Sequence, residues 1–366
     1  MVTATQDIIL EEIHVEGYER VVKCSDPKTG MKAIIAIHDS RLGPALGGTR
    51  IYPYEKFDDA LFDVLRLSKG MTYKSALTES GLGGGKSVIL LDSVKGKTPE
   101  MLRSFGRAVE ALEGKYICAE DVGCSTEDVK IIREETVNVV GLAHKNSSGN
   151  PAPFTAWGVF RGIQATALAL FGTESLQGKK VAVQGLGSVG MILTDLLFWH
   201  GAKVIATDLD ENRCLHAKQK YGIEIVKPDE ILFVECDILA PCALGGIINK
   251  GSIPKLKCKA VAGATNNQFL DEKTDSKKLA ERGILYAPDF VINAGGLINV
   301  EFELCKEGYN PIVARNKVDK IFDTLTSIYS IAKQNRITTL QAAISLAEHR
   351  LEYGIGKRVE NLCFHH

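Results

Sequence analysis

The chain has 366 residues, 45% of them hydrophobic and 24% charged, with a formal net charge of −1 at pH 7. This length favours two domains, and the balanced charge excludes the strongly basic surface that binds nucleic acids or anionic lipids. The longest apolar runs, such as Val88–Leu91, are too short to span a bilayer, and residues 1–10 lack the features of a secretory signal. We therefore expect a cytoplasmic protein with a small-molecule substrate and no nucleic-acid or membrane partner.

Nine cysteines are scattered along the chain, several in apolar surroundings, as at Cys118, Cys236 and Cys242. The sequence has no Cys-x-x-Cys pair and no His-Glu-x-x-His motif. This pattern favours reduced core thiols over disulfides or a metal site, so we expect no bound metal.

Strand-like and helix-like segments alternate over the first 140 residues. The spacing of Leu61, Leu65 and Met71 is close to a helical period, and Thr98 is the expected N-cap of a second helix. We expect strands at 32–38, 87–91 and 116–119, and helices over 57–78 and 99–112.

After a polar segment at 145–150, the expected hinge, short strands and helical stretches alternate as in a doubly wound parallel sheet. These strands are expected at 181–184, 203–207, 236–239 and 260–262, and the residues from Asn316 onward have a helical pattern. We predict an α/β protein of two domains across a cleft. Residues 1–145 form an α/β catalytic and oligomerisation domain to which about 337–366 return, and residues 146–336 form a Rossmann domain.

The segment 178–210 has the features of a dinucleotide-binding turn. An expected strand leads into Gly185-Leu-Gly187-Ser-Val-Gly190, and a helix is expected over 191–200. Gly185 permits a tight turn, Gly187 lets the backbone approach the pyrophosphate, and Gly190 lets the helix pack closely on the strand. The pyrophosphate would lie at the helix N-terminus, beside Ser188 and Val189.

Asp208 is expected to select the cofactor. It follows Gly185 by 23 residues, at the end of the next expected strand, and would accept hydrogen bonds from the adenosine ribose. Its carboxylate would repel the 2′-phosphate of NADP, and neither Leu209 nor Asp210 supplies a cation. We therefore predict NAD, the alternative being a coincidental glycine-rich turn.

The run Gly81-Leu-Gly83-Gly-Gly85-Lys86-Ser87 is similar to a P-loop but departs from it twice. Ser80 stands where a P-loop has glycine, and a strand rather than a helix is expected after Lys86. We therefore expect a glycine-rich turn to present Lys86 at the start of a strand.

Two further side chains are candidates for the same site: Lys74, at the end of the helix expected over 57–78, and Asp121, at the end of a strand. Lysines brought together repel each other, and one that loses its proton can act as a general base while its charged partner binds a carboxylate. Taken singly, each is ordinarily a solvated surface residue.

Several segments, in order, resemble the Glu/Leu/Phe/Val amino-acid dehydrogenase family, in particular its leucine dehydrogenase branch. The resemblance extends from about Tyr18 to Arg350. The segments that carry it are 43–50 (GPALGGTR), 70–74 (GMTYK), 83–86 (GGGK), 119–123 (AEDVG), 149–151 (GNP), 240–246 (APCALGG) and 293–300 (NAGGLINV).

The resemblance implies NAD-dependent oxidative deamination of an L-amino acid to the 2-oxo acid, ammonia and NADH. It implies that Lys86 is the general base that activates water, and that Lys74 pairs with the substrate α-carboxylate beside the backbone of Gly47 and Gly48. Asp121 would assist proton transfer to and from the amino group.

For the cofactor, the resemblance implies that Asn267 and Asn293 hold the nicotinamide carboxamide, with Thr155 near the nicotinamide end and Cys242 also at the cofactor. It further implies homo-oligomers, either octamers or dimers.

The resemblance also bears on substrate choice. The glutamate branch has Lys at the position of Leu46 and Ser at that of Val300, so a buried side-chain carboxylate would lack partners here. Relatives acting on aromatic amino acids tend to carry Gly where this chain has Ala119. The expected pocket, which also includes Met71 and Leu297, therefore favours leucine, isoleucine or valine.

Two alternatives are weighed against this interpretation. Asn266 and Leu297 also occur in aromatic-specific relatives, so a phenylalanine or tryptophan dehydrogenase is the main alternative. A non-catalytic NAD-binding sensor is disfavoured because Lys74, Lys86 and Asp121 are all present.

Overall fold

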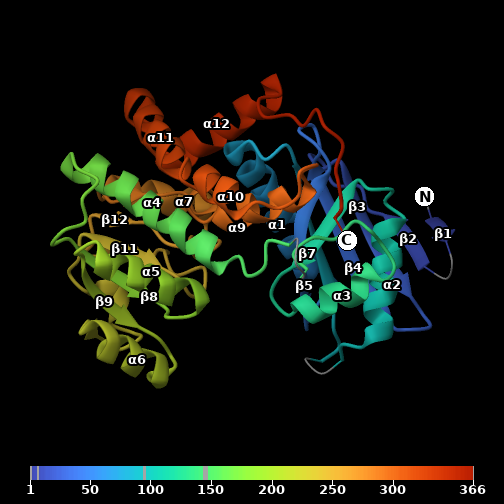
Figure 1. Cartoon of the computed structure of the whole chain (residues 1–366), viewed down its shortest axis with the longest axis horizontal. Coiled ribbons are helices and arrows are strands. Elements are labelled where there is room, and N and C mark those ends of the chain that lie inside the picture. The colour runs from blue at the N-terminus through green and yellow to red at the C-terminus, as the bar shows by residue number, and fades with distance from the viewer. Residues whose placement is uncertain (1, 6–7, 94–95, 143–146, 366) are drawn as a thin grey trace. The chain divides into compact units, whose positions relative to one another are not determined.

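The computed structural model describes residues 2–5, 8–93, 96–142 and 147–365 (Figure 1). The predicted boundary between residues 145 and 146, and the first residues of the predicted hinge, lie outside the described residues. The chain divides into two compact units, each formed from more than one segment. Unit 1 comprises Met1–Asn150, Val300–Pro311 and Ala347–His366, and unit 2 comprises Pro151–Asn299 and Ile312–Leu346.

Unit 1 contains a mixed sheet whose described strands run in the order β1-β2-β3-β4-β6-β5-β7. Neighbouring strands are antiparallel from β1 through β6 and parallel from β6 through β5 to β7. The strands are β1 (Val2–Thr5), β2 (Ile8–Glu12), β3 (Arg20–Asp26), β4 (Met31–Asp39), β5 (Ala45–Tyr52), β6 (Gly83–Leu90) and β7 (Tyr116–Glu120).

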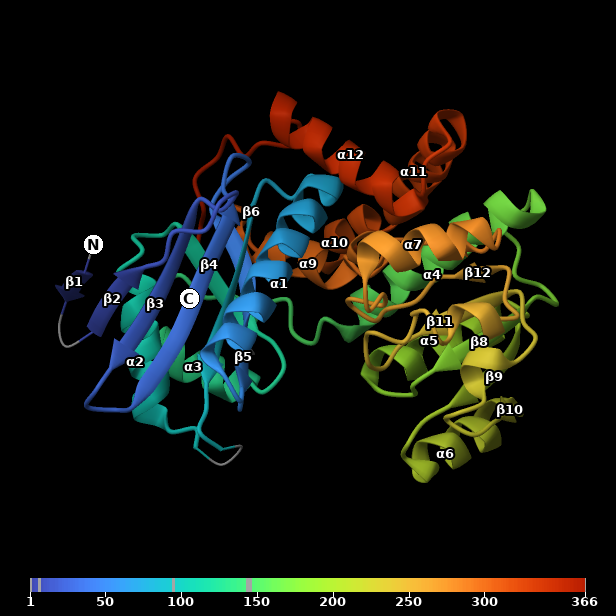
Figure 2. The same cartoon turned by 180° about the vertical axis from the view of Figure 1, so that it is seen from behind.

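Helices cover both faces of this sheet (Figures 1 and 2). Helix α1 (Phe57–Thr78) packs on one face, where its Val64 contacts a cluster that includes Ile34 and Val88. Helices α2 (Pro99–Glu110) and α3 (Thr126–Arg133) pack on the other. Successive strand residues point to opposite faces, so the sheet supplies apolar side chains to both layers. Thr98 caps α2 as predicted, accepting a hydrogen bond from the backbone N–H of Met101 at 3.2 Å.

Three of the four glycines of the run, Gly83 to Gly85, lie inside strand β6, and Gly81 lies before it. This corrects the prediction that a glycine-rich turn precedes the strand of Lys86. A Cβ on Gly84 would lie 2.1 Å from the backbone N of Thr72 on α1, and a Cβ on Gly85 would lie 2.8 Å from the Tyr116 ring. Side chains at these positions would therefore push away the helix on one face and the tyrosine on the other. The glycines allow close packing on both faces of the strand.

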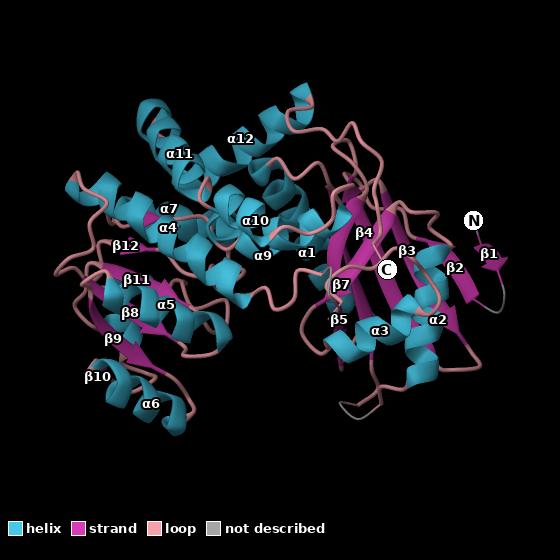
Figure 3. Cartoon of the chain, viewed as in Figure 1, coloured by secondary structure: helices cyan, strands magenta, loops and turns pink. Residues whose placement is uncertain are grey.

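Unit 2 contains a parallel sheet in the order β10-β9-β8-β11-β12-β13, the strand order of a Rossmann domain (Figure 3). The predicted α/β class is therefore confirmed. The strands are β8 (Lys180–Gln184), β9 (Lys203–Thr207), β10 (Glu224–Ile225), β11 (Ile238–Pro241), β12 (Ala260–Val261) and β13 (Leu285–Tyr286). The helices from residue 151 onward are α4 (Ala152–Phe171), α5 (Ser188–Trp199), α6 (Glu211–Tyr221), α7 (Glu272–Glu281), α8 (Asp289–Ile292), α9 (Gly295–Glu301), α10 (Pro311–Val318), α11 (Ile321–Asn335) and α12 (Thr339–Tyr353).

The C-terminal segment of unit 1 packs against the segment that begins the chain. On α12, Arg350 donates hydrogen bonds to the carbonyl oxygens of Ala76 (3.1 Å) and Leu77 (2.9 Å) at the end of α1. Beyond Tyr353 the described residues are not helical, so the helical pattern expected from Asn316 onward ends there. None of the described helices is long and apolar enough to cross a membrane.

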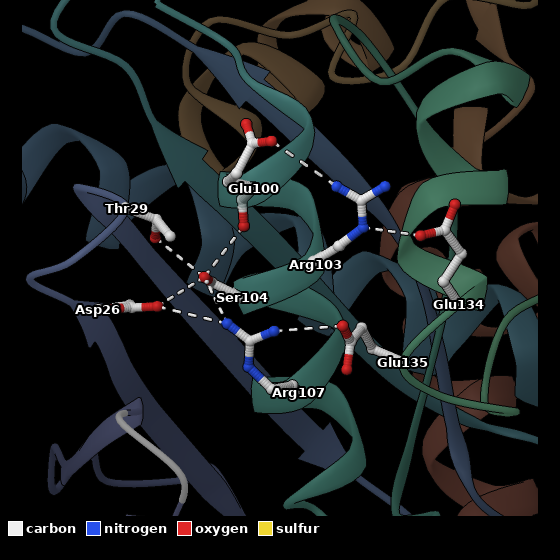
Figure 4. Close-up of polar contacts among 8 residues, drawn as sticks. All are labelled: Asp26, Thr29, Glu100, Arg103, Ser104, Arg107, Glu134 and Glu135. Carbon is white, nitrogen blue, oxygen red and sulfur yellow. Dashed lines mark hydrogen bonds and ion pairs between the residues drawn. The ribbon is translucent and has the colours of Figure 1, made fainter.

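A buried carboxylate ties three segments of unit 1 together (Figure 4). Asp26, at the end of β3, is 2% exposed and accepts hydrogen bonds from Ser104 Oγ (2.6 Å) and the Lys28 backbone N–H (2.9 Å). Arg107 on α2 lies 3.5 Å from the Asp26 carboxylate and 3.2 Å from that of Glu135. Burial raises the pKa of Asp26, but these hydrogen bonds and the guanidinium outweigh it and hold the pKa below its usual range.

Replacing Asp26 with Asn should lower the free energy of unfolding by about 1–3 kcal/mol at neutral pH, because buried donors lose a charged acceptor. The folded-state pKa is depressed, so the carboxylate stabilises the fold above its unfolded-state pKa, and this contribution is lost as the pH falls through the folded-state pKa. Urea unfolding of both proteins from about pH 7 down to about pH 3 should show their difference shrinking in the acidic range.

Asp92→Asn is the matched control. The Asp92 side chain is 96% exposed and lies 3.5 Å from Lys32, so its loss should change stability by less than about 0.5 kcal/mol. An Asp26→Asn variant as stable as the parent at neutral pH would contradict the role of the network.

Candidate functional site

Three adjacent strands of unit 1 place predicted site residues on the sheet face that α1 covers. Gly84 faces α1, so Lys86, two residues along β6, faces the same side. Leu46 pairs with Gly84 across the parallel strands, and Gly48 on β5 pairs with Ala119 on β7. Paired residues of neighbouring strands share a face, so the structure brings these positions together.

Lys86 and Asp121 form a buried ion pair on this face. The Lys86 ammonium donates a hydrogen bond to Asp121 Oδ2, and the two side chains are 8% and 18% exposed. The other carboxylate oxygen accepts a hydrogen bond from the Val122 backbone N–H at 2.7 Å. A Cβ on Gly48 would lie 3.2 Å from Lys86 Nζ and 2.9 Å from Asp121 Cβ, so this glycine leaves room for the pair.

The electrostatics of the pair keep Asp121 ionised. Burial raises the pKa of its carboxyl, but attraction to Lys86 and then to Arg50 outweighs burial and holds the pKa at about 2. Arg50 Nε lies 3.8 Å from Asp121 Oδ2. The sequence interpretation missed Arg50, although its place two residues after Gly48 on a strand puts it on the same face. The carboxylate is therefore charged, and it stabilises the adjacent ammonium.

Gly47 serves the packing of the strands beneath this pair. A Cβ at this position would lie 1.9 Å from the carbonyl oxygen of Gly85 on β6. The Gly47 carbonyl oxygen accepts a hydrogen bond from the buried Tyr116 hydroxyl at 2.8 Å, and the same hydroxyl lies 3.0 Å from Ser87 Oγ. These contacts on the opposite face hold β5, β6 and β7 in register.

The remaining predicted residues of unit 1 lie on helices. Met71 and Lys74 are half-buried on α1, beside the two positions where the helix meets β6. One is Thr72 over Gly84, and the other is Ser75, whose hydroxyl donates to a β6 carbonyl oxygen at 3.2 Å. Val300 lies on α9, in the segment 300–311 that belongs to unit 1.

In unit 2 the glycine-rich turn joins β8 to α5, and two of its glycines leave no room for a side chain. Gly185 has a φ of +97°, in the left-handed range that favours glycine. A Cβ on Gly190 would lie 1.9 Å from the Gly185 carbonyl oxygen, whereas the nearest atom to a Cβ on Gly187 would be 3.9 Å away. Helix α5 begins at Ser188, three residues before the predicted start, so its first N–H groups lie directly after the turn.

A cavity of about 410 Å³ lies over this turn, within the size range of small-molecule sites. Asp208 Oδ2 accepts a hydrogen bond from the Leu186 backbone N–H at 2.6 Å. Arg213, on the first turn of α6, lies 3.7 Å from Asp208 and 3.4 Å from Asp210. The sequence interpretation missed Arg213. Residues lining the cavity include Gly185, Gly187, Asp208, Arg213, Cys242 and Leu244. A larger cavity, of about 800 Å³, lies between α4, α7 and α11 and contains none of the predicted site residues.

The two polar atoms of the Asn293 side chain differ in their hydrogen bonding. Its Nδ2 donates hydrogen bonds to the Ala264 carbonyl oxygen (2.9 Å) and to Asn266 Oδ1 (2.6 Å). Its Oδ1 is buried and has no hydrogen-bond partner among the described residues. This oxygen could accept a hydrogen bond from an amide donor of a bound molecule. Asn267 adopts a left-handed conformation with a φ of +52°.

The last two predicted residues of unit 2 lie where α4 and α9 meet. Thr155 is on α4, and its Oγ1 would lie 3.0 Å from a Cβ on Gly296 of α9. Leu297 follows on α9 and is 7% exposed.

Comparison with known proteins gives matches in both units. A family model described as the dimerisation domain of Glu/Leu/Phe/Val dehydrogenase matches residues 18–138. A second, described as Glutamate/Leucine/Phenylalanine/Valine dehydrogenase, matches residues 207–352.

Individual relatives match nearly the whole chain. The leucine dehydrogenase of Thermoactinomyces intermedius is 51% identical over 94% of this chain and 93% of its own length. That of Geobacillus stearothermophilus is 50% identical over 92% of this chain and 91% of its own length. The crystal structure of L-tryptophan dehydrogenase from Nostoc punctiforme matches with a TM-score of 0.81 and 46% identity, covering 92% of this chain and 97% of that one.

Replacing Gly190 with Ala should destabilise the protein by about 1–3 kcal/mol, because the added methyl group would overlap the Gly185 carbonyl oxygen. Gly187→Ala is the matched control, since an added methyl group has open space there and the backbone φ of −71° suits alanine. Thermal unfolding should show a clearly lower Tm for Gly190→Ala than for Gly187→Ala, which loses only the small preference for glycine at the N-cap of α5. Equal Tm values for the two variants would contradict the assigned packing.

Proposed function

This chain belongs to the Glu/Leu/Phe/Val dehydrogenase family, and from that membership we propose that it oxidatively deaminates branched-chain L-amino acids. L-leucine, water and NAD⁺ give 4-methyl-2-oxopentanoate, ammonium, NADH and a proton, and the reaction is reversible. Valine and isoleucine are further substrates. The observation that carries the proposal is the buried Lys86–Asp121 pair in a chain about half identical to leucine dehydrogenases.

As a dehydrogenase of this family, the protein uses a nicotinamide cofactor, which accepts the hydride from the substrate Cα. We assign the cofactor to unit 2. The open space over Gly187 and the first N–H groups of α5 suit a pyrophosphate. The buried, unpartnered Oδ1 of Asn293 suits the amide donor of a carboxamide. Ser188, Val189, Thr155, Cys242 and Asn267 complete the proposed contacts.

NAD is the proposed cofactor, rather than NADP. Asp208 lines the cavity over the turn and would repel a 2′-phosphate. Arg213 is the nearby cation, but its guanidinium already pairs with Asp208 and Asp210. This arrangement supports recognition of an unphosphorylated ribose.

The substrate contacts are assigned to unit 1. Lys74 would pair with the α-carboxylate, where a charge-assisted hydrogen bond gives both affinity and orientation. The backbone of Gly47 and Gly48 would contact the same group. The apolar side chain would contact Leu46, which is 3% exposed and has no charge to offer a glutamate carboxylate.

Lys86 and Asp121 would move the protons. Removal of the hydride leaves an iminium carbon that water must attack, and Lys86 Nζ in its neutral form would take a proton from that water. Asp121 Oδ2 would exchange a proton with the substrate nitrogen. Their direct contact supports this division, because a proton can pass between the two groups without crossing bulk solvent.

We propose that the substrate side chain also contacts Met71, Ala119, Leu297 and Val300. We also propose that the protein forms homo-oligomers, since unit 1 matches a family model described as a dimerisation domain.

The parent enzyme should form NADH with L-leucine, L-valine and L-isoleucine at alkaline pH, and should be much slower with L-glutamate or with NADP. Leu46→Lys should lower kcat/KM for leucine by on the order of tenfold or more, because an ammonium would stand in the apolar pocket. Initial rates of absorbance change at 340 nm measure both effects. Preferential use of L-tryptophan or L-phenylalanine would contradict the proposed substrate class.

Lys86→Ala should lower kcat by about 10²–10⁴-fold, the usual contribution of a general base, while leaving NAD affinity nearly unchanged. Steady-state kinetics and NAD titration by calorimetry check the two parts. Lys23→Ala is the control, because that side chain is 42% exposed and pairs with Glu11 away from the site. A Lys86→Ala variant with most of its activity would refute the assigned base.

A further inference from the structure

We propose that Arg50 is a positioning residue for the Lys86–Asp121 pair: its fixed positive charge on Asp121 allows Lys86 to give up its proton at lower pH. The inference rests on the proposed function, in which Lys86 acts as the base. It starts from a contact that the proposed roles do not explain. Arg50 is a second cation beside Asp121 Oδ2, the oxygen that already accepts a hydrogen bond from Lys86.

Arg50 is built into the site rather than placed at the surface. Its side chain is 21% exposed, and it pairs across the strands with Val88, on the face where Lys86 lies. The guanidinium is anchored by Asp63 of α1, whose Oδ2 lies 2.8 Å from Arg50 and also accepts a hydrogen bond from Tyr54 at 2.6 Å. The anchor directs the other edge of the guanidinium toward Asp121.

Among the described residues, the Arg50 nitrogen nearest Asp121 has no other partner. Arg50 Nε is buried, makes no hydrogen bond with any described residue, and lies 3.8 Å from Asp121 Oδ2. A buried N–H group is costly to leave unsatisfied, so its persistence beside a carboxylate indicates an electrostatic role. A small movement of Asp121 as it releases Lys86 would convert this ion pair into a hydrogen bond.

The consequence for Lys86 follows from the sign of each charge. A carboxylate in contact with an ammonium favours the charged lysine, which opposes its action as a base. A second cation on the same carboxylate oxygen offsets part of that attraction. Because a guanidinium does not lose its proton at any working pH, this offset persists when Lys86 becomes neutral.

Other ionisable groups lie on every element around the pair. Except for Asp63, which one of the variants below replaces, they are the same in the parent and in the variants, so they set the position of the pH profile but not the difference between proteins. They are His38 and Asp39 on β4, Asp63, Lys69 and Lys74 on α1, and Tyr116, Cys118 and Glu120 on β7.

The test is the pH dependence of kcat/KM for leucine oxidation, measured from about pH 6 to about pH 11. Arg50→Gln should move the acidic limb to higher pH by about one unit, the smaller end of the effect of one nearby charge. The rate below the limb should fall on the order of tenfold and recover at high pH. Arg50→Lys, which retains a cation, should move the limb by less than half as much.

Two further variants complete the test, one with the opposite expected shift and one as a control. Asp63→Asn removes a negative charge beside Arg50 and should move the limb in the opposite direction, to lower pH; this variant also serves if Arg50→Gln does not fold. Arg107→Gln is the matched control, because Arg107 is a comparably buried arginine (26% exposed) in the Asp26 network of the same unit. It should leave the limb in place.

An unmoved limb in Arg50→Gln, or a loss of rate that is equal at every pH, would overturn the inference while leaving the proposed function intact. An Asp63→Asn limb displaced to higher pH would also overturn it. Absence of leucine-dependent NADH formation by the parent enzyme would instead count against the proposed function.

Discussion

Close contact between backbones, permitted by missing Cβ atoms, is the constraint on which the site in unit 1 depends. Strands β5 and β6 meet at Gly47 and Gly85, and α1 meets β6 at Gly84. A methyl group at any of these positions would overlap a neighbouring atom, because interiors are packed too densely to absorb it. The separations among the charged side chains follow from these backbone contacts.

The two faces of strands β5 and β6 differ in character: one is packed with neutral groups, and the other carries the charged pair. On one face Tyr116 fills the space left by Gly85 and bonds the Gly47 carbonyl oxygen, which fixes the register. On the other face, the space beside Gly48 is occupied by the ends of Lys86 and Asp121. Neutral packing on one side thus holds a pair of opposite charges on the other, where burial would otherwise disfavour them.

Local patterns predicted the parts of this structure that depend on residues near in sequence. The turn at Gly185–Gly190 was predicted because its strand, glycines and helix are contiguous, and the Thr98 cap because a cap acts within one turn. The interior position of the β6 glycines was not predicted. Its cause is Tyr116 and Thr72, which are distant in sequence, and a glycine-rich run by itself is typical of a turn. Arg50 was missed for the same reason, since its partner Asp121 is brought close only by strand pairing.

The order of segments in unit 1 has a consequence for synthesis of the chain. Glu303 accepts hydrogen bonds from the backbone N–H groups of Gly141 and Ser148, and the backbone N–H of Arg358 donates to the Leu42 carbonyl oxygen. The sheet of this unit is translated before unit 2, but the unit is completed only when residues 347–366 emerge. The first-made strands must therefore wait, without their final contacts, while most of unit 2 is translated and can fold. A nascent chain in that interval is the form most in need of protection from aggregation.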